Sequence, residues 1–294
     1  MKMPNFLIIG AQKAGTSALY HYLKQHPQIY MSPVKEPHFF SYDGDKLDYQ
    51  GPLKTTTPVI TNVEKYSKLF EAAPQGAVIG EASPSYIYGP ISAERIQHYI
   101  PKAKIIAVLR HPAERAYSNF VHAIRYGNEP IKDFAQALQE EEKRISEKWG
   151  FLWHYQRKGF YYEQLKRYFD KFDQEQIRVY LYEDLNSNPI KILKDIFKFL
   201  EIDETFTPDV SLRYNVSGIP KNKILRDLEI KLNPLKPVLR HLISDRLRIY
   251  IRSKTFNKPP SLAPEIRRQL IEVYREDILK LQALIQQDLS SWLK

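Results

Sequence analysis

The sequence predicts an α/β fold in which a central parallel sheet of about five strands is flanked by helices. Short runs rich in β-branched or aromatic residues predict the strands, and segments with helical periodicity lie between them. Strands that alternate with helices pair in parallel and are covered on both faces. The runs are Phe6–Ile9, Ile29–Met31, Val78–Gly80, Ile105–Leu109 and Ile177–Tyr182.

The predicted helices lie between these strands. Asn188 precedes Pro189, a residue that suits the first turn of a helix because its missing N–H has no partner there, and the helix continues over Ile190–Leu200. Charged amphipathic patterns predict helices over Asp133–Lys148 and Gly159–Phe172. The remaining predictions are helices over Val63–Phe70, over Ser92–Tyr99 and from about Pro112-Ala113, with a loop at Thr55–Pro58.

Length and composition favour one large domain. The chain has 294 residues, 43% of them hydrophobic, which is enough for a sizeable core. We expect a single domain over residues 1–294. The chain has no cysteine, which excludes disulfides, thiolate metal sites and cysteine nucleophiles.

The first strand runs into a loop bounded by Gly10 and Gly15, and a helix follows from Thr16. This P-loop-like arrangement, typical of three-layer α/β folds, aims backbone N–H groups and the positive end of a helix dipole at one point, where a phosphate or similar oxyanion binds. A nucleotide-triphosphatase loop has its lysine after the second glycine. Here Lys13 lies inside the loop and Thr16 follows Gly15 directly. The loop therefore predicts an anion site without the usual magnesium arrangement.

Further candidate site residues lie at or just after the ends of other predicted strands. Arg110 ends a strand, and a guanidinium at a strand end commonly binds an anion. Glu36 follows the second strand, at the sheet edge where open α/β folds bind ligands, and a carboxylate there can accept a proton. Thr16 and Ser17 are candidate helix-cap hydroxyls that also hydrogen-bond phosphate. The structural alternatives are a solvated surface lysine at position 13 and a surface glutamate at 36.

Three segments in order along the chain resemble one enzyme family: the loop Gly10–Ser17, the run Lys35–Phe40, and Ile105–Ser118, in which serine follows Arg110 by eight positions. Together they are similar to the sulfotransferases that use 3′-phosphoadenosine-5′-phosphosulfate (PAPS). The chain most resembles the heparan sulfate (carbohydrate) branch and is identified as a bacterial-type cytosolic member. The likeness extends more loosely to Asp288–Leu293.

The resemblance implies PAPS as co-substrate, adenosine 3′,5′-bisphosphate as product, and no metal. It places Arg110 and Ser118 on the 3′-phosphate. A late loop ending at Lys221 would close over the nucleotide with Lys221, or its rival Lys223, on the same phosphate. Residues 1–210 would form the nucleotide-binding core, and 211–294 the late loop and a basic helical part. The residues implied at the 5′-phosphosulfate are Lys13, Ala14, Gly15, Thr16 and Ser17.

The resemblance also implies the catalytic residues. Glu36 would be the base that accepts the proton of the acceptor hydroxyl, and Lys13 would neutralise charge on the leaving phosphate. His38 would bind substrate or assist catalysis. Ala82 stands where the heparan branch has a lysine, which leaves the acceptor open; Lys35 could supply a charge nearby. The predicted reaction is in-line sulfuryl transfer to a hydroxyl of a carbohydrate or glycoconjugate.

Charge is concentrated late in the chain. Residues 221–258 hold eleven lysine or arginine residues against three acidic ones, and so supply +8 of the formal net charge of +10. Three readings stay open: a solvated helical cover, a membrane-surface helix, and a surface for an anionic glycan. No nucleic-acid-binding signature accompanies the charge, so we expect no nucleic-acid partner.

Alternatives within and outside the class remain at this point. The acceptor could be the hydroxyl of a small metabolite or lipid. A P-loop nucleotide kinase is disfavoured by the displaced Lys13 and by Arg110, which stands where an acidic magnesium partner is expected. A noncatalytic anion-binding protein is the third alternative. With no apolar leader and no apolar run of about eighteen residues, we expect a cytoplasmic protein, peripheral at most to the inner membrane face.

Overall fold

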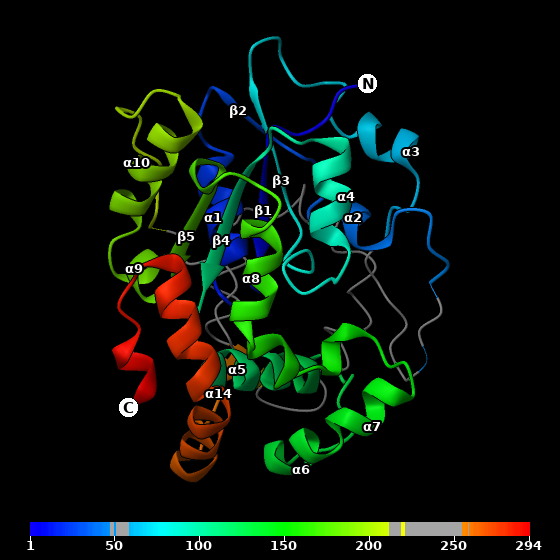
Figure 1. The fold of residues 1–294 in the computed structure, drawn as a ribbon, viewed down its shortest axis with the longest axis vertical. Helices are drawn as coiled ribbons and strands as arrows, with labels where there is room; N and C mark the ends of the chain where they lie inside the picture. The colour runs from blue at the N-terminus through cyan, green and yellow to red at the C-terminus, as the bar shows by residue number, and fades with distance from the viewer. Residues whose placement is uncertain (48–49, 51–58, 212–218, 221–254, 258) are drawn as a thin grey trace.

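The computed structural model describes residues 1–47, 50, 59–211, 219–220, 255–257 and 259–294. Its centre is a five-stranded, all-parallel sheet in the order β2-β3-β1-β4-β5, with helices around it (Figure 1). The predicted fold class is therefore confirmed. The strands are β1 (Phe6–Gly10), β2 (Ile29–Met31), β3 (Val78–Ala82), β4 (Lys104–Leu109) and β5 (Ile177–Leu181).

The strands are mostly hydrophobic because the sheet is covered on both faces; the charged exceptions are Glu81 on β3, Lys104 on β4 and Arg178 on β5. All five residues of the central strand β1 are buried, which matches its uninterrupted apolar run. The α-helices are α1 (Thr16–Leu23), α2 (Phe39–Tyr42), α3 (Val63–Lys68), α4 (Ser92–Tyr99), α5 (Pro112–Arg125), α6 (Phe134–Gln139), α7 (Glu141–Ser146), α8 (Tyr161–Phe169), α9 (Tyr182–Ser187), α10 (Pro189–Leu200) and α14 (Pro264–Ile285).

Shorter elements complete the described chain. The 3-10 turns are η1 (Phe151–Trp153), η2 (Arg157–Gly159), η3 (Gln174–Gln176) and η5 (Ser290–Leu293). A small antiparallel pair joins β6 (Ile219–Pro220) to β7 (Phe256–Asn257). Over the described residues, no helix is both long and apolar enough to cross a membrane. The predicted loop at Thr55–Pro58 and most of the basic segment 221–258 lie outside the described residues.

The single helix predicted over Asp133–Lys148 is wrong. The segment forms two short helices, α6 and α7, which meet at Glu140. The break lets charged residues of α7 turn inward: Arg144 makes two hydrogen bonds to the buried Glu129, and Glu141 accepts the backbone N–H groups of Gln156 and Arg157. These partners lie outside the segment, so its own periodicity does not reveal them.

The helix predicted from Gly159 begins later, at Tyr161. Gly159 belongs to η2, where a Cβ would stand 2.6 Å from the ring of Tyr274. The first N–H groups of α8, those of Tyr161 and Tyr162, donate to the carboxylate of Asp277 on α14. A cap supplied by a helix more than a hundred residues away therefore decides where α8 starts.

The sheet order brings three connections together at the carboxyl ends of the strands. β1 lies between β3 and β4, so the loop after β1 is flanked by the segments that follow both. Backbone hydrogen bonds join them: Ala11 N–H donates to Val108, and Ser83 N–H donates to Ile8. Glu36 N–H donates to Ala82 and ties in the segment after β2. In Figure 1, α5, which follows β4, lies across this end of the sheet.

Candidate active site

The loop between β1 and α1 has the backbone of an anion site. Gly15 precedes α1 with a φ of 92°, and a Cβ there would stand 3.2 Å from the ring of Tyr182, so only glycine suits the position. No side chain caps the amino end of α1. The N–H groups at Thr16 and Ser17 are therefore without a side-chain acceptor and are placed for an oxyanion.

Lys13 lies in this loop, half-buried among cations. Its Nζ is 3.4 Å from Nδ1 of His122, and its carbonyl accepts a hydrogen bond of 3.3 Å from Arg110. Burial, followed by the charges of Arg125 and Arg110, lowers the pKa of Lys13 to about 8. A bound anion would offset that repulsion, so the loop favours anionic ligands on electrostatic grounds as well as by its backbone.

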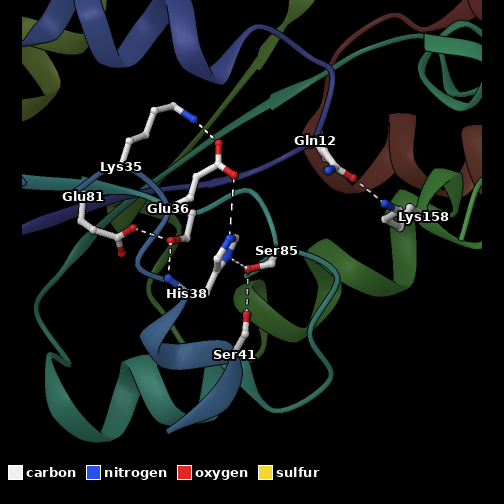
Figure 2. A network of polar contacts seen from close by, with 9 residues as sticks. Gln12, Lys35, Glu36, His38, Ser41, Glu81, Ser85 and Lys158 are labelled. Atoms are coloured by element: carbon white, nitrogen blue, oxygen red, sulfur yellow. Dashed lines mark hydrogen bonds and ion pairs between the residues drawn. The ribbon is translucent and has the colours of Figure 1, made fainter. Parts of the chain in front are cut away.

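The charges of Glu36 and Lys13 act on each other's pKa. Glu36 forms an ion pair with Lys35, and its Oε2 is 3.8 Å from Nε2 of His38 (Figure 2). Burial raises the pKa of Glu36, but the charges of Lys35 and His38 outweigh it, with a smaller contribution from Lys13, so the pKa lies below its usual value. The carboxylate is therefore ionised at neutral pH, the form that can accept a proton.

His38 is held by two serines from the segment after β3. Its Nδ1 is 2.7 Å from the hydroxyl of Ser85, and its backbone N–H donates to the hydroxyl of Ser83 at 3.0 Å. Ser85 is in turn 2.9 Å from the hydroxyl of Ser41 (Figure 2). Burial lowers the pKa of His38, which favours the neutral form of the ring. A neutral imidazole can either donate or accept a proton beside Glu36.

The buried carboxylate of Glu81 holds Ser83, one of the two serines that contact His38. Glu81 on β3 is fully buried and accepts hydrogen bonds from Ser83 at 2.6 Å and from Tyr66 at 3.3 Å. Burial raises the pKa of Glu81 to about 7. The sequence analysis did not assign Glu81 a role, although an acidic residue inside an apolar strand is the signal that could have singled it out.

Position 82, where the resemblance expects a lysine, is a fully buried alanine and supplies no cation. Lys35 supplies a charge in the same region through its ion pair with Glu36. The direction of the Lys35 side chain, which the strand pattern left open, is toward the candidate base.

Arg110 and Ser118, the residues predicted to bind the 3′-phosphate, each have a feature that suits an anion. Arg110 stacks its guanidinium over the ring of Tyr182 at 4.8 Å. Ser118 on α5 is 7% exposed, and its hydroxyl has no hydrogen-bond partner among the described residues. Buried hydroxyls normally have a partner, so this one fits a ligand group such as a phosphate.

One face of α5 turns toward the loop and contains residues that the sequence analysis missed. His122 follows Ser118 by four positions and contacts Lys13, while Arg125 acts on the charge of Lys13. The Arg125 guanidinium also stacks over Phe256 at 4.4 Å, so the described end of the late segment reaches this helix. The predicted phosphate ligand Lys221 and its rival Lys223 lie outside the described residues.

The three residues predicted to be catalytic share an unusual backbone. Lys13, Glu36 and His38 have φ values of 74°, 63° and 58°, in the left-handed region that non-glycine residues rarely adopt. Such positions cost about 1–3 kcal/mol each and are concentrated at active sites. The other described non-glycine residues with positive φ are Glu201 and Gln286, which cap the ends of α10 and α14, and Lys148, which lies two residues after α7.

Comparisons with known proteins agree on one family. A model of the sulfotransferase domain matches residues 3–216. The crystal structure of a sulfotransferase from Alicyclobacillus acidocaldarius is similar to this chain, with 32% identity, a TM-score of 0.80 and coverage of 100% of both chains.

Two curated relatives are more distant. The membrane-associated sulfotransferase kil1 of Dictyostelium discoideum is 26% identical over 76% of this chain and 61% of its own length. The bifunctional heparan sulfate N-deacetylase/N-sulfotransferase 4 of Mus musculus is 27% identical over 99% of this chain and 31% of its own length. The chain thus spans less than two thirds of the curated relatives it matches.

Proposed function

The chain belongs to the sulfotransferase domain family, and on that basis we propose that it transfers the sulfuryl group of PAPS to a hydroxyl of a carbohydrate or glycoconjugate. The carbohydrate acceptor is supported by the mouse relative, whose name specifies heparan sulfate and which matches nearly the whole chain. On the acceptor side, Ala82 stands where the resemblance implies a lysine, and Lys35 pairs with Glu36.

The donor would bind across the ends of β1 and β4. Lys13, Thr16 and Ser17, with the backbone of Ala14 and Gly15, would hold the 5′-phosphosulfate by N–H groups, hydroxyls and one cation. Arg110 and Ser118 would hold the 3′-phosphate, because one offers a guanidinium and the other a buried hydroxyl without a described partner.

The chemistry proposed for the chain is a single displacement at sulfur. The acceptor oxygen attacks, its proton passes to the Glu36 carboxylate, and the bond from sulfur to the bridging oxygen breaks. The electron pair of that bond stays on the phosphate of adenosine 3′,5′-bisphosphate, where Lys13 neutralises the new charge. His38 would orient the acceptor or relay the proton, since it lies 3.8 Å from Glu36.

One observation carries the proposal. The candidate base and the loop cation act on each other: Lys13 contributes to the lowered pKa of Glu36, and Glu36 offsets part of the lowering of the pKa of Lys13. A site that moves a sulfuryl group needs a proton acceptor and a leaving-group cation on either side of one sulfur atom. These residues come from the segments after β2 and β1, which the fold brings to the same edge of the sheet.

The experiment is a transfer assay with PAPS labelled in its sulfuryl group, against a panel of sugars, glycolipids, phenols and lipid alcohols. We expect label on sugar hydroxyls. Label found only on phenols or lipid alcohols would overturn the assignment of a carbohydrate acceptor, while the sulfotransferase activity would stand. Failure to bind adenosine 3′,5′-bisphosphate and to transfer label to any acceptor would overturn the proposed function itself.

A further inference from the structure

Lys158 is a buried lysine that the proposed reaction does not use. It lies in η2 and is only 6% exposed. Its Nζ is 2.5 Å from Oε1 of Gln12 and 3.4 Å from Oδ1 of Asn119 (Figure 2). Both acceptors are neutral amides, so neither of these hydrogen bonds gives Lys158 a charged partner. An ammonium group buried on amides alone is costly to maintain.

The surroundings increase that cost. Arg115 on α5 is fully buried, and its Nε and Nη1 have no partner among the described residues. Burial, followed by the charge of Arg115, lowers the pKa of Lys158 well below its usual value, and Lys13 adds to this effect. Glu141 acts in the opposite direction, but its carboxylate accepts two backbone N–H groups. Packing alone would be better served by an apolar side chain.

The contact with Gln12 has a definite chemical consequence. Gln12 immediately precedes Lys13 in the loop after β1. In the structure the Nζ of Lys158 donates to the Oε1 of Gln12, so the oxygen of the Gln12 amide faces Lys158. The amide nitrogen, with its two N–H donors, is therefore turned away from Lys158, as Figure 2 shows. Lys158 thus decides which end of this amide the loop presents to a ligand.

We propose that Gln12 donates an N–H to the transferred sulfuryl group and that Lys158 is the positioning residue that orients the Gln12 amide. The inference rests on the function proposed above. The bisphosphate product has no sulfuryl group, so Gln12 and Lys158 should matter for turnover of PAPS and not for binding of the product.

The first test is Gln12→Glu. The substitution keeps the size of the side chain and gives Lys158 a carboxylate partner, so the melting temperature should hold or rise. It removes the N–H donors, and removal of one preorganised donor to a transition state costs about 10²–10³ in kcat. We expect a loss of about a hundredfold in kcat, with affinity for adenosine 3′,5′-bisphosphate reduced far less. Wild-type kcat in Gln12→Glu would overturn the inference.

The second test is Lys158→Met, with Lys166→Met as control, because Lys166 is an exposed lysine on α8 paired with Asp170. Lys158→Met should lower kcat by about ten- to a hundredfold without lowering the melting temperature. The double variant Gln12→Ala/Lys158→Met should be no slower than Gln12→Ala, since Lys158 acts through Gln12. A purely structural lysine would instead show a lower melting temperature, or a loss of kcat that multiplies in the double variant. A wild-type protein that neither binds PAPS nor transfers its sulfuryl group would overturn the proposed function. Variants with wild-type kcat would overturn only the roles of Gln12 and Lys158.

Discussion

Removal of the Ser118 hydroxyl tests the 3′-phosphate site with the least disturbance of the protein. Ser118 is buried on α5, and its hydroxyl makes no hydrogen bond with a described residue. The Ser118→Ala variant therefore breaks no internal hydrogen bond and removes a buried polar group without a partner. Because such a group carries a desolvation cost, the melting temperature of the ligand-free variant should stay the same or rise.

The magnitude of the binding effect follows from the one contact that is lost. A hydrogen bond to a charged group contributes about 1.5–3 kcal/mol, and a tenfold change in Kd corresponds to about 1.4 kcal/mol. Ser118→Ala should therefore weaken adenosine 3′,5′-bisphosphate by about ten- to a hundredfold. Adenosine 5′-monophosphate has no 3′-phosphate, so its affinity should not change. Arg110→Ala is a less clean probe, because Arg110 also donates to the carbonyl of Lys13.

Titration calorimetry of both nucleotides on both proteins measures the difference directly. Ser92→Ala is a matched control, since Ser92 on α4 is also a fully buried serine whose hydroxyl has no described partner. The control should bind both nucleotides as the wild type does. An equal loss for the two nucleotides in Ser118→Ala, or no loss for the bisphosphate, would refute the assignment of Ser118. Equal affinity of the wild-type protein for both nucleotides would refute the 3′-phosphate site as a whole.

Four further outcomes are expected. Glu36→Gln keeps the shape of the side chain but cannot accept the proton, so kcat in the labelled-PAPS assay should fall by about a hundredfold or more while bisphosphate affinity barely changes; near-normal kcat would move the base to His38. Lys13→Ala should damage both turnover and bisphosphate binding in the same assays, and loss of only one would contradict its double role. Burial holds the pKa of Glu81 at about 7, above its usual 4.5, so the folded state binds this proton more tightly than the unfolded state does. The resulting contribution to stability is lost as the pH rises from about 4.5 to about 7. Glu81→Gln should flatten that part of a plot of unfolding free energy against pH, and an unchanged slope would argue against the shift. Transfer should continue in excess EDTA, because the loop lacks the magnesium-binding order of lysine and hydroxyl, and a loss restored by magnesium would contradict this.

The strands were predictable because each is a short apolar run that only a doubly covered parallel sheet can bury. β2 has the predicted bounds, and the others differ by one or two residues at their ends. The helices were less predictable where distant residues decide their limits. Asp277 caps α8 from α14, and Glu129 draws Arg144 inward at the break between α6 and α7. Neither contact leaves a trace in the local periodicity.

Some residues of the candidate site were predictable from the sequence, and others were not. Lys13, Glu36 and Arg110 were found because each follows a predicted strand, and parallel strands bring their carboxyl ends to one edge. Lys158 was missed because nothing in its surrounding sequence indicates burial. It reaches Gln12 across 146 positions of the chain, and only the packing of η2 beneath the loop places the two together.

The sequence by itself determined the sheet, the anion loop and the family resemblance, because these depend on residue types at short, regular spacings. The tertiary structure decided the protonation and orientation of the site: the ionised Glu36, the lowered pKa of His38, the buried Glu81 and the hydrogen bond from Lys158 to Gln12. These properties depend on desolvation and on charges brought within a few ångströms by folding. Sequence spacing carries no measure of burial, and contacts such as that between Lys158 and Gln12 join segments that are far apart along the chain.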